Sequence, residues 1–303
     1  MVKRLLFTKL YLIAAGVMMF YFSVQLFVGY VRPGAIIERN GSNKDLFELM
    51  EKSVDGQNPK RDLALEELKK NSSTSVPYLI SLLNNFDPEV RYKAIDTLGN
   101  VGEIGNVAIP SLILRLKDNN NIVRFTTAAA LGKMGESAKA AVPALMLNLK
   151  DSDMYSRSYA AQALGKMGDS GKVAIPDLIL LLKDQEGPVR SGAAEALGMM
   201  GDSAKVAIPD LILLLKDQES YVRSNAAKAL GMMGDASKVA IPNLIVLLKD
   251  SNSLTREISV RALGKIGEPA KVAIPDLIPL LNDPEPGIRE EAVKALEVLK
   301  NNP

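Results

Sequence analysis

Most of the chain repeats the pattern of residues 175–201, IPDLILLLKDQEGPVRSGAAEALGMMG. The segments 172–204 and 205–237 are identical at 27 of 33 positions. A proline and an arginine also recur every 33 residues. The prolines are Pro77, Pro110, Pro143, Pro176, Pro209, Pro242 and Pro275, and the arginines are Arg91, Arg124, Arg157, Arg190, Arg223, Arg256 and Arg289. Repetition at a fixed period of about 20–50 residues is typical of solenoid proteins.

Each 33-residue unit predicts two helices joined by a polar turn. Apolar residues such as Ile175, Leu178 and Leu182 follow the proline at spacings that favour a helix. Proline fits the first turn of a helix; if the preceding segment is also helical, the helix is kinked there instead. The second helix is expected over 188–200, ending at Gly201, because glycine commonly terminates helices. Stacked helix pairs of this kind form an all-α solenoid.

The solenoid is expected to cover residues 44–303, as seven regular units preceded by one degenerate unit. In the degenerate unit, 45–52 predicts a short helix, and Pro59 is expected to open a second helix that runs through Lys69. Terminal units of solenoids are commonly atypical because one side faces water. The last unit carries Glu297 where the others carry glycine, which predicts a longer, charged final helix as an end cap.

A single transmembrane helix is expected at residues 10–31, which form 22 consecutive residues without a charge. A helix of this length spans about 33 Å, enough for a hydrocarbon core of about 30 Å. A cleaved signal peptide is the alternative, although its apolar core is normally shorter. A basic tail (1–9) precedes the segment and a linker (32–43) follows it. The positive-inside rule favours a signal anchor with its N-terminus inside and the solenoid on the periplasmic side.

Composition narrows the possible functions. The chain has no cysteine and no histidine, so disulfides and thiolate catalysis are excluded, and the commonest general base and zinc ligand are missing. We therefore expect no enzyme activity, no catalytic residue, no cofactor or metal and no small-molecule substrate. Residues 1–32 hold four of the 37 basic side chains and none of the 35 acids, which leaves the rest with a formal charge of −2. That balance disfavours nucleic-acid binding.

The repeats resemble the HEAT-repeat family, in particular the short bacterial HEAT-like repeats first described in phycobilisome lyases. The pattern is I-P-x-L-x-x-x-L-K-D followed by V-R-x-x-A-A-x-A-L-G-x-M-G, at 175–184 and 189–201. The resemblance is strong over 72–303 and weak over 44–71. It implies an armadillo-like solenoid that acts as a scaffold or adaptor. A minority of such proteins are lyases or isomerases that attach bilins to antenna proteins, but no residue motif here matches that activity.

An acid precedes six of the recurring arginines by six residues; the first unit has Asn85 instead. The pairs are Asp118 and Arg124, Asp151 and Arg157, Asp184 and Arg190, Asp217 and Arg223, Asp250 and Arg256, and Asp283 and Arg289. An arginine row could bind phosphates or other polyanions. The matched row of acids instead favours a structural ladder. In that ladder each aspartate accepts hydrogen bonds from helix-end N–H groups and from the arginine of the next unit.

One face of the second helices is expected to line the concave side of the solenoid. In each unit it consists of three positions, which lie two residues before, one residue after and five residues after the recurring arginine. Successive positions are three and four residues apart, so they share one face of the helix. The early units carry large side chains on or beside this face, and the later units are polar. These side chains are Tyr92, Ile122, Phe125, Tyr155 and Tyr159. Clustered exposed aromatics often mark binding surfaces, although these could instead pack against neighbouring units.

The sequence therefore predicts a membrane-anchored scaffold. It would bind a protein partner on its concave face, and the partner is expected to be a subunit of a membrane complex. An accessory lyase or chaperone for a tetrapyrrole-bearing protein is the alternative.

Overall fold

The computed structural model describes residues 41–301. The expected membrane helix at 10–31, the basic tail and most of the linker lie outside these residues. Among the helices that the structure does describe, none is both long and apolar enough to cross a membrane. Contacts between residues divide the chain into two compact parts after Glu48, and the larger part is Leu49–Pro303. The fold and the site below are those of this part.

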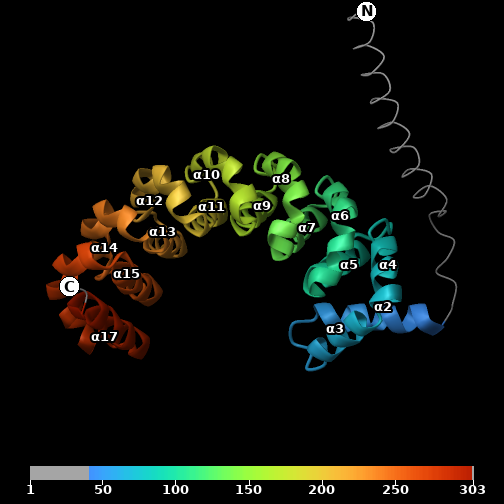
Figure 1. Ribbon diagram of the computed structural model, residues 1–303, viewed down its shortest axis with the longest axis horizontal. Coiled ribbons are helices and arrows are strands. Elements are labelled where there is room, and N and C mark those ends of the chain that lie inside the picture. Colours follow the sequence, from blue (N-terminus) through green and yellow to red (C-terminus); the bar gives the residue numbers. More distant parts are fainter. Residues whose placement is uncertain (1–40, 302–303) are drawn as a thin grey trace, which may run out of the picture. The chain divides into compact units, whose positions relative to one another are not determined.

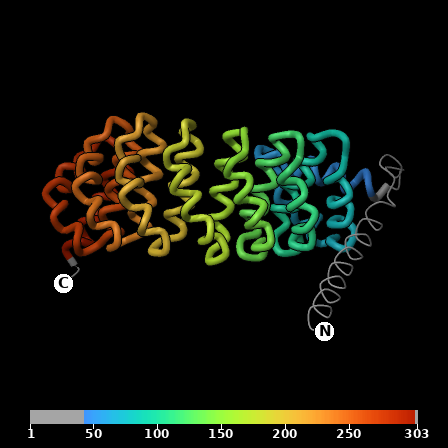
Figure 2. The backbone as a smooth tube through the Cα atoms, turned by 90° about the horizontal axis from the view of Figure 1, so that it is seen from above, coloured from blue at the N-terminus to red at the C-terminus, as the bar shows by residue number. Residues whose placement is uncertain are grey.

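Regular structure in the described residues is entirely helical, as the repeat predicts. In Figure 1 one helix of each pair lies on the outer side of an arc and the other on the inner side. The outer helices are α4 (Ser72–Leu82), α6 (Ile109–Arg115), α8 (Val142–Asn148), α10 (Ile175–Leu181), α12 (Ile208–Leu214), α14 (Ile241–Leu247) and α16 (Ile274–Leu277). The inner helices are α5 (Pro88–Asn100), α7 (Asn121–Met134), α9 (Met154–Lys166), α11 (Gly187–Met199), α13 (Ser220–Met232), α15 (Ser253–Ile266) and α17 (Pro286–Asn301). Figure 2 shows these pairs following one another in chain order in a single row.

The degenerate first unit consists of α2 (Gly41–Val54) and α3 (Arg61–Lys70). Two expected boundaries are wrong here. The first helix begins at Gly41, inside the range assigned to the linker. The second begins at Arg61 rather than Pro59, because Asn58 forms a turn there: its side-chain oxygen accepts the Lys60 N–H at 2.9 Å and its carbonyl accepts the Arg61 N–H at 3.0 Å.

The segment before each recurring proline is helical in the regular units, but it is a 3₁₀ helix. These segments are η1 (Gly102–Ala108), η2 (Gly135–Ala141), η3 (Gly168–Ala174), η4 (Gly201–Ala207), η5 (Gly234–Ala240) and η6 (Glu268–Ala273), and η7 (Ile278–Asn282) follows α16. The α-helix then begins one residue before the proline, as at Ile208. Proline has no N–H for an α-helical bond and its ring crowds the preceding turn, so the tighter 3₁₀ segment comes before it. Pro77 differs, because it lies inside α4.

Glycine ends the inner helices from α5 to α15 and also brings them together. Gly201 follows the C-cap of α11 with φ of 56°, a left-handed conformation that glycine adopts without steric cost. Gly198, one turn earlier, faces the next inner helix. A Cβ atom at this position would lie 2.7 Å from Cα of Ala229 in α13. The two glycines of the recurring LGxxG pattern therefore combine a helix stop with a close helix–helix contact.

The core runs continuously between the outer and inner helices of successive units. In one unit it contains Leu178 from α10 and Val189, Ala193 and Leu197 from α11, all fully buried. Small alanines on α11 and α13 let the inner helices approach closely, and leucines from both rows fill the remaining space. The last inner helix, α17, has 16 residues and is longer than the others, as expected for an end cap.

Candidate partner-binding surface

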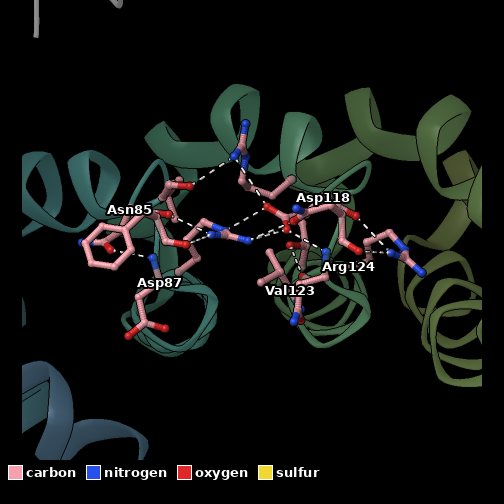
Figure 3. A network of polar contacts seen from close by, with 12 residues as sticks. Asn85, Asp87, Asp118, Val123 and Arg124 are labelled. Atoms are coloured by element: carbon pink, nitrogen blue, oxygen red, sulfur yellow. Dashed lines mark hydrogen bonds and ion pairs between the residues drawn. The ribbon is translucent and has the colours of Figure 1, made fainter. Parts of the chain in front are cut away.

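The Asp–Arg ladder links each unit to the next, and its pairing runs in the opposite direction from the one expected. Each aspartate accepts from the arginine 27 residues before it, in the preceding unit. Arg91 Nε lies 3.0 Å from Oδ2 of Asp118, and Arg91 Nη2 lies 2.7 Å from Oδ1. Asp118 Oδ1 also accepts the N–H of Asn120, at 3.0 Å. Figure 3 shows Asp118 between the turn of Asn85 and the turn before Arg124.

The same geometry recurs along the array. The two hydrogen bonds of each pair measure 2.7–3.1 Å. The pairs in the described residues are Arg91–Asp118, Arg124–Asp151, Arg157–Asp184, Arg190–Asp217, Arg223–Asp250 and Arg256–Asp283. Each arginine also donates Nη1 to two carbonyls of its own turn, as Arg190 does to Asp184 and Gln185. Because its donors face the protein, the ladder joins units and offers little to an external anion.

Electrostatics favour the ionised form of four ladder aspartates, Asp184, Asp217, Asp250 and Asp283. Burial acts to raise the pKa of Asp217, but the Arg190 guanidinium and the Glu219 N–H outweigh it and hold that pKa below its ordinary value. At Asp283 the hydrogen bond from Arg256 is the largest influence, and its pKa is also lowered. Arg289 begins no further rung among the described residues, and donates only to the carbonyls of Asp283 and Pro284.

Aromatic side chains gather at one end of the inner row of helices. The Phe125 ring, on α7, stacks on Tyr159 of α9 with centroids 5.5 Å apart and planes 19° apart. Tyr155, one turn before Tyr159, meets Phe125 at 5.8 Å in a tilted arrangement. Tyr92 of α5 lies on the same side of the array. The structure thus brings together residues that the sequence places 67 positions apart.

Beside these rings is a hollow of about 650 Å³. Its lining includes Tyr92, Phe125 and Tyr159, three of the five side chains predicted for partner binding. Tyr155 and Ile122 do not line it. Both lie more than two-fifths exposed, Tyr155 at 44% and Ile122 at 41%. The remaining lining residues are Glu51, Val54, Asp55, Lys93, Asp96, Thr126, Ala129 and Lys133.

Charged groups surround the aromatic rings, and most of them are paired. Lys93 Nζ lies 2.7 Å from Glu51 and 2.8 Å from Glu89. Burial acts to lower the pKa of Lys93, but the two glutamates outweigh it and hold the pKa well above its ordinary value. Lys133 Nζ lies 2.8 Å from Asp96 and donates to Asn100 at 2.9 Å. Asp55 accepts the Gln57 N–H and has no cationic partner among the described residues.

Several of these residues were not predicted from the sequence. Glu51, Asp55, Lys93 and Lys133 line the hollow because three helices and the end of α2 converge there. Phe86 was also missed. It is 94% exposed in the turn before α5, where the later units carry polar residues or proline. Phe86 stands out when the same position is compared across the units. The charged residues of the lining do not, because only the packing of the helices brings them together.

The family model for HEAT repeats matches residues 44–132, 76–153, 142–212 and 208–297. The chain belongs to the HEAT-repeat family. The resemblance noted from the I-P and V-R patterns is therefore confirmed, and it extends into the degenerate first unit. A search of curated proteins found no match.

Solved structures share the HEAT/armadillo-like fold. The YibA protein of Escherichia coli has a TM-score of 0.59 at 21% identity, over 86% of this chain and 96% of that one. An engineered protein has a TM-score of 0.55 at 22% identity, over 83% and 77%. The complex of CpcE and CpcF of phycocyanin lyase from Nostoc sp. PCC7120 has a TM-score of 0.51 at 27% identity, over 74% and 94%. The first two likenesses are of fold alone.

Proposed function

We propose that this HEAT-repeat protein is a scaffold that binds a protein partner through its concave face, at the end formed by α5, α7 and α9. The observation that carries this proposal is the hollow of about 650 Å³ lined by Tyr92, Phe125 and Tyr159. These three rings are half-buried. Aromatic side chains provide much of the binding energy in protein interfaces. Solenoids present long surfaces of this kind to their partners.

Aromatic side chains are not clustered on the inner helices of the later units, which carry only Tyr221, on α13 and 40% exposed. A second hollow, of about 290 Å³, is lined by side chains of α13 and α15 and contains no aromatic ring and no carboxylate. Its lining is Ser224, Asn225, Lys228, Leu254, Ile258, Arg261, Ala262 and Lys265. Since the repeat builds the same backbone in both places, the difference lies in the side chains. We assign partner recognition to the early units for this reason.

The proposal includes a membrane anchor at residues 10–31, which rests on the 22-residue uncharged segment alone. The solenoid would then lie on the periplasmic side, close to other membrane proteins, and its partner would be a subunit of a membrane complex. Extraction of the native membranes with alkaline carbonate tests the anchor, and the intact mass of the purified protein tests cleavage. Release into the soluble fraction, or a mass lacking the first residues, would contradict it.

The proposed scaffold has no enzyme activity of its own. The experiment is isolation of the tagged full-length chain from its native membranes in mild detergent, followed by identification of stoichiometric companions. One companion that depends on the concave aromatics supports the scaffold. Recovery of the chain without any stoichiometric companion argues against it.

An accessory role for a tetrapyrrole-bearing protein is the second candidate, and the similarity to the phycocyanin lyase complex favours it. The two candidates differ in a simple optical property. A scaffold is colourless as purified, whereas a protein that handles a tetrapyrrole should retain visible absorbance or acquire it when mixed with the pigment.

A further inference from the structure

We propose that the hollow at α5, α7 and α9, called here the aromatic hollow, receives an arginine side chain of the partner. This inference rests on the proposed function and adds the chemistry that the partner must present. It is drawn from two features that occur together: the faces of aromatic rings and a surplus of negative charge.

The rings provide the first feature. Phe125 and Tyr159 are stacked and half-buried, and Tyr92 completes the aromatic part of the lining. Aromatic faces carry a negative quadrupole that attracts cations. A guanidinium group suits such a site best, because it is planar, weakly hydrated and able to stack on a ring.

The charge balance provides the second feature. The lining contains three carboxylates, Glu51, Asp55 and Asp96, against the two ammonium groups of Lys93 and Lys133. Glu89 adds a further carboxylate through its contact with Lys93. Both lysines are held by these acids, so they are not available to attract an anion. Asp55 is exposed and lacks an ion-pair partner among the described residues.

Other occupants fit less well. An apolar plug would remove water from the carboxylates without replacing their hydrogen bonds, which costs free energy. An anionic side chain would meet the surplus of negative charge. An arginine can lie against the rings and donate to Asp55 at the same time, and charge-assisted bonds of this kind are the stronger ones. The second hollow, with Lys228, Arg261 and Lys265 in its lining, offers neither feature.

The test uses the full-length protein in detergent, labelled with 3-fluorotyrosine and observed by fluorine NMR. The probe is the tripeptide Ac-Ala-Arg-Ala-NH2, and the matched control is the same peptide with citrulline, which has nearly the same shape but no charge. Tyr92→Phe and Tyr159→Phe assign the two signals of interest, and Tyr221, on α13, reports on a later unit of the array.

We expect the arginine peptide to shift the Tyr92 and Tyr159 signals with an affinity about tenfold higher than that of the citrulline peptide, and to leave Tyr221 unmoved. Asp55→Asn should weaken arginine binding about three- to tenfold, because it removes the unpaired carboxylate without disturbing an ion pair. The inference is overturned if citrulline binds equally well, if Asp55→Asn has no effect, or if no shift occurs at Tyr92 and Tyr159.

The proposed function fails in a different way. If the arginine peptide does not bind but serine at Tyr92, Phe125 and Tyr159 still releases the partner, the inference is wrong and the scaffold proposal stands. If the peptide binds but that variant retains its partner, concave-face binding is wrong, and so is the arginine inference as a statement about the partner.

Discussion

Arg190 and Asp217, 27 residues apart in the sequence, are joined by two hydrogen bonds, Nε to Oδ2 at 2.7 Å and Nη2 to Oδ1 at 2.9 Å. Arg190 lies in α11 and Asp217 in the turn before α13, so this pair connects adjacent units. The side chains are only 16% and 8% exposed. A two-bond contact repeated in this position fixes the angle between units, because a guanidinium fork accepts a carboxylate in few orientations.

Arg190→Ala should therefore destabilise the array by about 2–3 kcal/mol, since it leaves a nearly buried carboxylate and two carbonyls without their donor. Arg289→Ala is the matched control, because within residues 41–301 the Arg289 side chain donates only to the carbonyls of its own turn. Urea unfolding followed by circular dichroism measures both. If both variants lost the same small amount of unfolding free energy, the hydrogen bonds between units would contribute little to stability.

The ladder should also make stability depend on acid pH. Arg157, Arg190 and Arg223 lower the pKa values of Asp184, Asp217 and Asp250 in the folded state, despite the opposing effect of burial. The unfolded chain then binds more protons between these lowered values and the ordinary aspartate pKa of about 3.9. The contribution of the ladder to the free energy of unfolding is therefore complete above this pH range. It is lost as the pH falls through the lowered pKa values.

A pH series of urea titrations on the wild type and Arg190→Ala tests this sign. The difference in unfolding free energy between the two proteins should be constant from neutral pH to about pH 5 and should narrow at lower pH. A difference that widens on acidification would contradict the assigned pairing.

Gly198→Ala tests the close approach of α11 and α13. In an isolated helix this change is favourable by about 0.8–1.0 kcal/mol. Here the new methyl group would lie 2.7 Å from Ala229 Cα, so we expect a net loss of about 1–3 kcal/mol from overpacking. Gly56→Ala is the control, because nothing lies within 4 Å of its added Cβ. Stabilisation by Gly198→Ala would mean that the helices separate at little cost.

Two leucines of α10 test the division between core and surface. Leu178 is fully buried, while Leu180 is 67% exposed on the outer helix. Leu178→Ala should cost about 2–5 kcal/mol, as for other buried leucines. Leu180→Gln should change the free energy of unfolding by no more than about 0.5 kcal/mol. Comparable losses at both positions would indicate that the outer face is covered in the folded protein.

The fold was predictable because the period of 33 residues repeats both the apolar positions and the helix ends. The direction in which the Asp–Arg pairs connect the units was harder to predict. Arg190 lies 27 residues before Asp217, Arg223 six after it, and Arg256, the partner expected from the next unit, 39 after it. All three spacings follow from the same period, so the sequence alone did not determine which arginine the carboxylate meets. Only the stacking of units places Arg190 over Asp217.

The candidate site was predictable in part. The rings of Tyr92, Phe125 and Tyr159 stood out because the later units carry polar residues there. The charges around them did not, because Glu51 comes from the degenerate unit and contacts Lys93 across 42 residues. Asp55 lies in the turn between α2 and α3, and nothing in the repeat pattern placed that turn beside the rings of α7 and α9.

Partner retention by a concave-face variant tests the central claim most directly. Tyr92, Phe125 and Tyr159 are replaced together by serine in the tagged full-length chain, with Tyr221→Ser as the control on α13. Circular dichroism first establishes that both variants keep the wild-type helix content. The measurement is the molar ratio of the co-purified partner to the tagged chain. We predict that the triple variant loses the partner at least tenfold while Tyr221→Ser retains it, and an unchanged ratio in the folded triple variant would contradict the account.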